Sequence, residues 1–225
     1  MKLRNKLLLA LTILFWTSMS EAKSYSYLAL GDSYTIGEGV PNSDAWPNQL
    51  AKALTKKGFA IDTPKIIART GWRTDNLMAA IEAEKLIGKF DLVSVLIGVN
   101  NQFQGKSIDV YKTDFRAILS IAINHCTYGK NGVFVLSIPD YGATPFGKLE
   151  REAIGKEIDE WNSAANLICE EFEIPFYDIT PISKKAKDDS SLLAKDELHP
   201  SGKMYGLWVD QITTSVSGLL TSLKK

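Results

Sequence analysis

Short apolar runs of strand length alternate with longer amphipathic segments along most of this chain. That alternation is typical of repeated βα units, in which crossover helices join parallel strands. Several runs are hydrophobic at nearly every position, as expected when helices cover both faces of a sheet. The sequence therefore predicts one α/β domain with a central five-stranded parallel sheet, and its strands are expected at Tyr25–Leu30, Lys65–Ala68, Leu92–Ile97, Val133–Ile138 and Pro175–Tyr177.

The segments between these runs are long enough to cross back over a sheet as helices. The fourth is the clearest, because its apolar residues recur at alternating spacings of four and three, which places them on one helix face. We expect that face to pack in the core, through Ile154, Ile158, Trp161, Ala165, Ile168 and Phe172. By contrast, Ser183–Lys195 is rich in Lys, Asp and Ser and predicts a solvated loop. The predicted helices are Trp46–Lys57, Thr74–Ile87, Ile108–Ile123, Leu149–Phe172 and Lys203–Leu223.

Residues 1–22 have the features of a secretory signal peptide. Three basic residues among the first six precede an apolar run, Leu7–Trp16, and small residues follow at Ser20 and Ala22. The run falls short of the usual membrane-spanning length, which favours cleavage after Ala22 over an uncleaved anchor. We therefore expect a mature domain of residues 23–225, exported to the periplasm or beyond and without stable membrane insertion.

Charge and cysteine content narrow the possible functions. The 26 basic and 26 acidic residues give a formal net charge of zero, and no basic stripe is interleaved with aromatics. Nucleic-acid binding needs such an electrostatic footprint, so we expect no nucleic-acid partner. Export would permit a disulfide between Cys126 and Cys169, although buried free thiols in helical patterns are an equally good interpretation.

Gly31-Asp32-Ser33-Tyr34 follows the first predicted strand, and ligands of open α/β sheets bind at the carboxyl ends of their strands. A serine there is well placed for nucleophilic catalysis, provided that a base takes its proton and a third group orients that base. Alone, a Gly-Asp-Ser sequence is an ordinary turn.

The chain has two histidines, His125 and His199. Asp196 precedes His199 by three residues, and one tight turn of that length can bring a carboxylate to the imidazole Nδ1. His125 ends a predicted helix. We therefore expect His199 to be the base and Asp196 its partner, the alternative being that Asp-x-x-His-Pro is only a helix cap.

Acyl transfer also requires hydrogen-bond donors for the oxyanion that develops on the substrate. Gly71 follows the second predicted strand, where the missing side chain lets a backbone N–H approach a ligand. Asn100 follows the third strand and offers a neutral amide donor. Each of them, taken alone, would be an ordinary loop residue.

The four segments, in this order, resemble the SGNH/GDSL hydrolase family over about residues 25 to 205: Gly31-Asp32-Ser33, Gly71, Gly98-x-Asn100 and Asp196-x-x-His199-Pro200. The resemblance implies a flavodoxin-like three-layer α/β/α sandwich. It also implies an oxyanion hole formed by the Ser33 N–H, the Gly71 N–H and the Asn100 side chain, with no metal and no cofactor. The family often has Asp where this chain has Asn101, a departure that affects the packing of the loop.

The resemblance leaves the substrate open, because the family acts on acetylated sugars, lipids, lysophospholipids and thioesters. We favour small-acyl esters of carbohydrates or small molecules, with a lipase, lysophospholipase or thioesterase as the alternative. Trp72, Phe103, Tyr141 and Phe146 lie in predicted loops near strand ends, where they would line the site or pack in the core. The segment Gln102–Lys106, just after Asn100, is expected to influence which substrates the site accepts.

A non-catalytic ligand-binding protein of the same fold is the rival in a different class, since fold does not determine function. In that case the first loop would hold a phosphate. Such a protein has no need of Asp196-x-x-His199, which therefore favours catalysis.

Overall fold

A parallel sheet forms the centre of the structure, a computed structural model that describes residues 24–223. Its strands follow the order β2-β1-β3-β4-β5, which is the order of flavodoxin-like folds. The predicted signal peptide, residues 1–22, lies outside the described residues. The strands are β1 Tyr27–Gly31, β2 Lys65–Ala68, β3 Leu92–Leu96, β4 Val133–Leu136 and β5 Phe176–Tyr177.

Each predicted strand is confirmed, with ends that differ by two residues or fewer. The three inner strands β1, β3 and β4 are buried at every position, which explains why their sequences are almost continuously apolar. The edge strands β2 and β5 are only partly buried.

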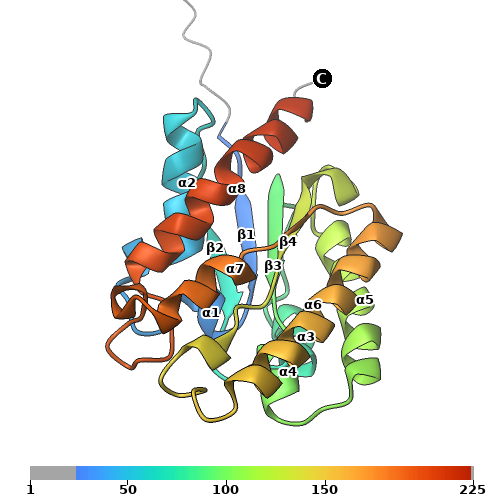
Figure 1. Ribbon diagram of the computed structural model, residues 1–225. Helices are drawn as coiled ribbons and strands as arrows, with labels where there is room; N and C mark the ends of the chain where they lie inside the picture. The colour runs from blue at the N-terminus through green and yellow to red at the C-terminus, as the bar shows by residue number, and fades with distance from the viewer. Residues whose placement is uncertain (1–23, 224–225) are drawn as a thin grey trace, which may run out of the picture.

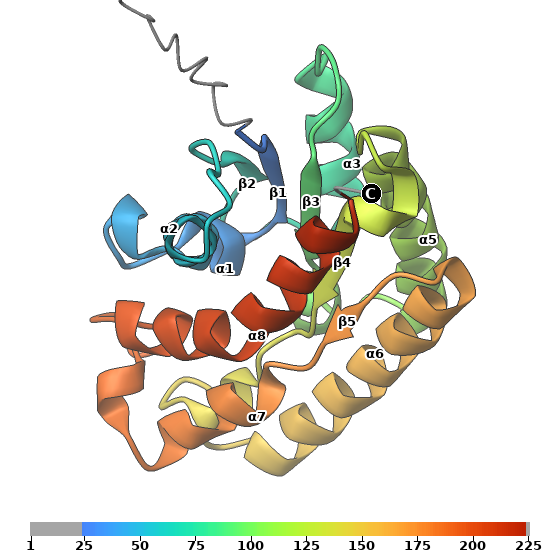
Figure 2. The ribbon, with the colours of Figure 1, turned by 90° about the horizontal axis from the view of Figure 1, so that it is seen from above.

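Helices cover both faces of the sheet (Figure 1). The view from above shows the long helices in two groups, one on each side of the sheet (Figure 2). This arrangement confirms the three-layer α/β/α sandwich of flavodoxin-like topology. The first face is covered by α2 Trp46–Lys56 and α8 Gly202–Ser222, and the second by α3 Thr74–Ala83, α5 Ile108–Asn124 and α6 Arg151–Phe172.

The predicted apolar face of α6 packs in the core, where Ile158 is fully buried and Trp161 is 5% exposed. Sequence periodicity missed the adjacent Asn162, which is also buried. Its amide accepts a hydrogen bond from the Ile138 N–H at 2.7 Å and donates to the Ile138 carbonyl at 2.9 Å. Because β4 has ended there, Asn162 replaces the ladder partners that this backbone would otherwise lack.

Two sequence predictions were partly wrong. The helix predicted to reach Ile87 ends at Ala83, since Ile87 is 99% exposed and adds nothing to the buried face. The segment Ser183–Lys195 is not a freely solvated loop, because it contains short 3₁₀ turns that bury Ala186 and Leu192. Isolated buried residues among many charged ones leave no period for a sequence pattern to detect.

Both cysteines are free and buried. Cys126 follows α5, and its Sγ lies 3.8 Å from the Asp91 carbonyl. Cys169 lies on the buried side of α6, where desolvation raises the pKa of its thiol to about 12. The structure therefore supports the second interpretation of the sequence, in which Cys126 and Cys169 are buried free thiols.

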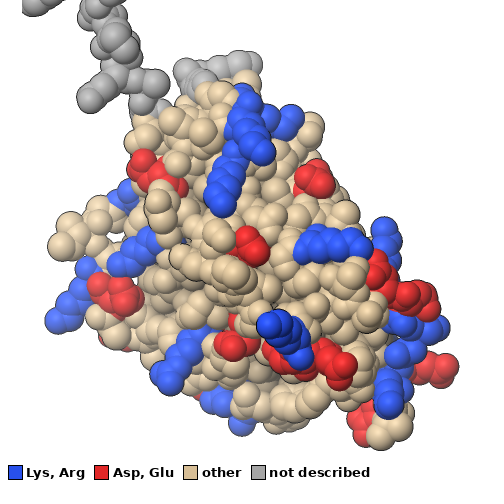
Figure 3. Space-filling model, turned by 90° about the vertical axis from the view of Figure 1, so that its left-hand side faces the viewer, with Lys and Arg blue, Asp and Glu red and all other residues tan. Residues whose placement is uncertain are grey.

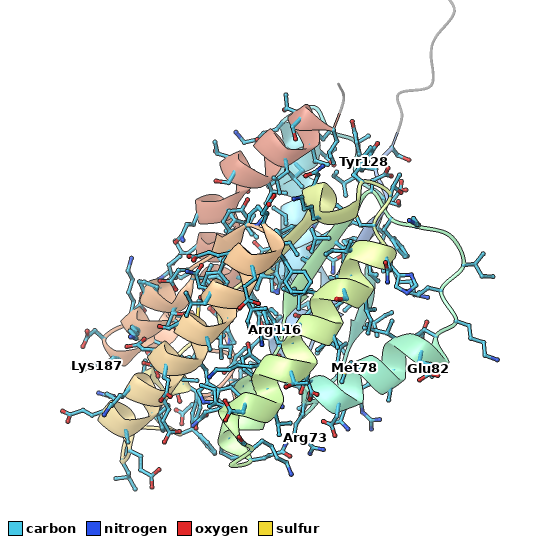
Figure 4. All side chains as sticks on the ribbon, turned by 90° about the vertical axis from the view of Figure 1, so that its right-hand side faces the viewer. Arg73, Met78, Glu82, Arg116, Tyr128 and Lys187 are labelled. Atoms are coloured by element: carbon cyan, nitrogen blue, oxygen red, sulfur yellow. The ribbon has the colours of Figure 1, made fainter. Side chains whose placement is uncertain are left out.

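The surface carries charges of both signs. On the face drawn in Figure 3, Lys and Arg side chains are interspersed with Asp and Glu. Figure 4 shows Arg116 between α5 and α6, where its guanidinium makes a two-pronged ion pair with Glu171, 2.7 and 2.9 Å long. None of the helices within residues 24–223 combines the length and the apolar character needed to cross a membrane.

Replacing Ile158 by Ala should lower the free energy of unfolding by about 2–5 kcal/mol, because it leaves a cavity under α6. Leu167→Ala is the matched control on the same helix, since that side chain is 59% exposed, and should change stability by less than about 0.5 kcal/mol. Urea denaturation measures both. Equal losses would show that the buried face of α6 is assigned incorrectly.

Candidate active site

The site lies where the chain connections leave the sheet in opposite directions, between β1 and β3. Ligands of open α/β sheets bind at the carboxyl ends of the strands at such a point. Ser33 begins α1 (Ser33–Ile36) directly after β1, and Asn100 lies in α4 (Val99–Phe103) directly after β3. Figure 1 shows α1 and α4 at the same end of the sheet.

The backbone around Ser33 is held in a tight strand-to-helix turn. Asp32 is the N-cap of α1, and its Oδ1 accepts a hydrogen bond from the Tyr34 N–H at 3.0 Å. Gly31 has no room for a side chain, because a Cβ there would collide with the Leu96 carbonyl oxygen and with Thr35. Only glycine therefore allows β1 to turn into α1 at this distance from β3.

Asp196 and His199 form a hydrogen-bonded pair. The His199 Nδ1 lies 2.7 Å from Asp196 Oδ2, and Asp196 Oδ1 accepts the backbone N–H groups of His199 at 2.9 Å and Leu198 at 3.1 Å. Glu197 takes a left-handed φ of 56° within this turn. One carboxylate thus fixes both the turn and the imidazole ring, as the three-residue spacing predicts.

The hydrogen bonds of this turn favour the ionised form of Asp196. Partial burial acts to raise the pKa of its carboxyl, but the hydrogen bonds from the His199 ring, the His199 N–H and the Leu198 N–H outweigh it and lower the pKa below its ordinary value. An ionised carboxylate accepts from the Nδ1–H, which leaves Nε2 as the nitrogen that can take a proton.

A cavity of about 170 Å³ brings the predicted site residues together, because Ser33, Gly71, Asn100 and His199 all line it. Asp196 stands behind His199, outside this lining. No hydrogen bond between described residues joins the Ser33 hydroxyl to the His199 ring. Such contacts are often long in unliganded sites and tighten when substrate binds.

The three predicted oxyanion donors face the same space. Gly71 has a φ of 82°, a conformation that favours glycine, and the position where a side chain would begin faces open space. Within residues 24–223, the N–H groups of Ser33 and Gly71 take no hydrogen-bond acceptor. Asn100 Nδ2 donates one of its two hydrogens to the Trp72 carbonyl at 3.0 Å, and the other remains for a ligand.

His125 lies at the opposite end of the sheet, where β3 begins. It is the C-cap of α5, and its carbonyl accepts the N–H of Phe90, which precedes the start of β3. Asn100 follows the carboxyl end of β3, at the other end of the sheet. The structure therefore does not bring His125 near Ser33.

Aromatic side chains form one wall of the cavity. The rings of Phe103, Tyr141 and Phe146 contact one another, with centroids 5.9–6.3 Å apart, and all three line the cavity. Trp72 instead packs against the core. Sequence reasoning missed Tyr34, whose ring lies edge-on to His199 at 5.8 Å, although its position next to Ser33 was a usable signal.

Asp32 is a buried carboxyl directly beside Ser33. It is fully buried, and its Oδ2 has no hydrogen-bond partner among residues 24–223. Desolvation raises its pKa to about 7, although the hydrogen bond from the Tyr34 N–H acts to lower it. A neutral acid can remain buried there at modest cost, whereas the carboxylate cannot.

A flavodoxin-like sheet with serine and histidine side chains at its switch point defines the class of α/β serine hydrolases. Residues 29–207 match the model of the GDSL-like Lipase/Acylhydrolase family, and the chain belongs to that family. Family membership makes it a serine ester hydrolase. Within the described residues, no three His, Cys, Asp or Glu side chains are grouped to hold a metal ion.

Solved structures with the same fold include several esterases. A lipolytic G-D-S-L family protein from Veillonella parvula is 15% identical, with a TM-score of 0.65 over 84% of this chain and 96% of that one. The psychrotrophic esterase EstA from Pseudoalteromonas sp. is 17% identical, with a TM-score of 0.62 over 88% and 100%. A mutant of Axe2, an acetyl-xylooligosaccharide esterase from Geobacillus stearothermophilus, is 18% identical, with a TM-score of 0.68 over 88% and 96%. No curated protein sequence matches the chain.

Asp32→Asn should stabilise the protein increasingly as the pH rises from 5 to 8. Burial raises the pKa of Asp32 in the folded state, so its contribution to the free energy of unfolding is complete below its unfolded pKa near 4. That contribution is lost as the pH rises towards 7, because the buried side chain then ionises. Asn keeps the helix cap without ionising. The melting-temperature difference between variant and wild type should grow by roughly 5 °C.

Thermal melts at both pH values measure this difference. Asp109→Asn, at an aspartate whose side chain is 85% exposed, is the control and should show no such growth. A pH-independent difference for Asp32→Asn would mean that the buried carboxyl does not titrate in this range.

Proposed function

We propose that the chain is an exported serine esterase that cleaves carboxylic esters through an acyl-enzyme on Ser33. The single observation that carries the proposal is the 2.7 Å pair of His199 and Asp196, whose imidazole lines the same cavity as Ser33. Export rests on the signal-like residues 1–22.

The reaction begins when His199 Nε2 accepts the Ser33 hydroxyl proton and the Ser33 Oγ attacks the ester carbonyl carbon. Asp196 holds Nδ1–H and stabilises the imidazolium that forms. The carbonyl oxygen becomes an oxyanion, which accepts hydrogen bonds from the N–H groups of Ser33 and Gly71 and from the Asn100 amide. The C–O bond then breaks, and the alcohol leaves with the proton from His199.

Water completes the cycle. His199 takes a proton from a water molecule, whose oxygen attacks the acyl carbon, and the same donors hold the second oxyanion. When this intermediate collapses, Ser33 regains its proton from His199 and the acid is released. These steps use Ser33, His199 and the oxyanion donors of the cavity, Asp196 behind the imidazole ring, and water.

The size of the cavity supports small acyl groups. A cavity of about 170 Å³ has room for the reacting ester group with a short acyl chain, whereas a decanoyl chain would extend beyond it. The rings of Phe103, Tyr141 and Phe146 limit the length of the acyl group on one side of the cavity. Our proposed substrate is therefore an acetyl or similarly short ester of a carbohydrate or small molecule.

A lipase-type activity is the second candidate. Phe103 and Phe146 are 55% and 57% exposed, so a longer acyl chain would gain apolar contact by lying across them. A non-catalytic binding protein is less well supported, because it would have no use for a carboxylate that orients an imidazole beside a serine.

Ser33→Ala should lower ester hydrolysis by at least about 10⁴-fold, since it removes the nucleophile. His199→Ala should cause a similar loss, whereas His125→Ala should retain activity, because His125 lies at the other edge of the sheet. Hydrolysis of p-nitrophenyl esters from acetyl to decanoyl by the mature chain measures all three, and we expect the shortest esters to be cleaved best.

Undiminished hydrolysis by Ser33→Ala would refute the acyl-enzyme on this residue. A loss in His125→Ala as deep as that in His199→Ala would refute our choice of base. A maximum at octanoyl or decanoyl would replace the small-acyl proposal by the lipase-type activity.

Phe103→Ala should shift the preference towards longer acyl chains, because it removes part of the wall that limits the cavity. We expect the ratio of kcat/KM for hexanoyl over acetyl esters to rise about tenfold. Leu149→Ala is the control, since Leu149 is 91% exposed and lies outside the cavity lining. An unchanged ratio in Phe103→Ala would show that the aromatic wall does not limit the acyl group.

A further inference from the structure

Side chains of α4 and of its C-cap, Gln104, fasten the loop that carries Gly71, residues 69–74. Asn100 donates to the Trp72 carbonyl, and Arg73 donates from its guanidinium to the Gln104 side chain at 2.6 Å. Figure 4 shows Arg73 at the end of the helical layer where α3 and α5 begin. Two of the proposed oxyanion donors, from α4 and from this loop, therefore sit on segments that are bonded to each other.

The buried part of this connection runs through Asn101, which is 2% exposed. Asn101 Oδ1 accepts the N–H of Thr74 at 3.0 Å, and Asn101 Nδ2 donates to Thr74 Oγ1 at 2.7 Å. The Thr74 hydroxyl in turn donates to Asp114 Oδ2 on α5 at 2.6 Å. Three elements, α4, α3 and α5, thus meet at one fully buried threonine.

The hydrogen bonds at Thr74 have a fixed direction. The Asn101 carbonyl oxygen is engaged by a backbone N–H, so its amide nitrogen must face the Thr74 hydroxyl. That hydroxyl has a single hydrogen, which it gives to Asp114 because the carboxylate can only accept. The Asn101 amide, the Thr74 hydroxyl and Asp114 Oδ2 therefore each have a partner of the right kind, as buried polar networks require.

We propose that Asn101 is a positioning residue, which acts through Thr74 and Asp114 to hold the Gly71 loop, and with it the Gly71 N–H, at its working distance from the Asn100 amide. The proposal rests on the function proposed above, in which Gly71 and Asn100 both bind the oxyanion. Asn101 itself lies outside the cavity lining.

Thr74 is the buried attachment point of the Gly71 loop, whereas the contacts of Gln104 with this loop are exposed. Thr74 is three residues from Gly71, so a shift of the threonine passes directly along the short loop. Gly71 is exposed, and its own direct side-chain contact is a long hydrogen bond, 3.4 Å, from Gln104 Nε2 to its carbonyl. The opposite side of the loop is held by Thr70, whose hydroxyl donates to Glu38, an exposed contact.

The test exchanges the two side chains that face Thr74. In Asn101→Asp, two carboxylates compete for one hydroxyl hydrogen and repel each other, so the loop should shift. Asp114→Asn alone keeps an acceptor for the hydroxyl and should cost less. In the double variant N101D/D114N the hydroxyl donates to residue 101 and accepts from residue 114, which restores a full set of partners with the direction reversed.

Steady-state hydrolysis of p-nitrophenyl acetate, with active enzyme counted by stoichiometric phosphonate inhibition, should show a kcat loss of about ten- to a hundredfold for N101D. KM should change by less than about twofold, because the oxyanion contact forms in the transition state. The double variant should return to within about threefold of the wild type. Asp109→Asn, also on α5, is the control and should retain full activity.

A wild-type kcat for N101D overturns the proposal, and so does a double variant that is no better than N101D. A loss of titratable enzyme with unchanged kcat also overturns it, since that result describes a purely structural residue. Failure of the proposed function itself is distinguishable, because Ser33→Ala would then hydrolyse the same ester at the wild-type rate.

Discussion

The parallel pairing of β1 with β3 is the constraint on which the rest of this structure depends. It sets Gly31 beside Leu96 at the carboxyl ends of the two strands, so the chain leaves both strands at the same level. The Tyr27 hydroxyl lies 2.8 Å from the Ser94 hydroxyl inside this pair, a buried contact that fits only this register. A slip of one residue would displace the loops that carry Ser33 and Asn100 relative to each other and would move the side chains of one strand to the opposite face of the sheet.

The acid and base come from the far end of the chain and are held by local means. Asp196 bonds to the ring and to the backbone of His199 within one turn, and the neighbouring Leu193 forms an isolated antiparallel bridge with Pro200. The buried Leu192 anchors the segment to the core. This explains why a stretch rich in charge is folded: it supports the turn that presents His199 to the cavity.

Sequence alone predicted the sheet and most of the site, because both depend on simple regularities. Buried parallel strands are apolar almost throughout, and the residues directly after them lie at one end of the sheet, which is why Ser33, Gly71 and Asn100 could be predicted to line one cavity. The contacts that the sequence did not predict join residues that are far apart in the chain and close in space. Neither the contact of Asn101 with Thr74 and Asp114 nor the edge-on contact of Tyr34 with His199 has a period or a spacing in the chain. The solitary buried residues Ala186 and Leu192 are hidden for the same reason.

The two buried thiols bear on the chemical surroundings in which the chain can persist. Disulfide exchange proceeds through the thiolate, and burial raises the pKa of both Cys126 and Cys169, so almost none of either thiol is ionised at neutral pH. Once folded, the protein is therefore a poor substrate for oxidation and mixed-disulfide formation. If export delivers the chain to an oxidising compartment, the order of events matters: both thiols react less after folding than before it, so folding that buries Cys126 and Cys169 would protect the chain from covalent mispairing.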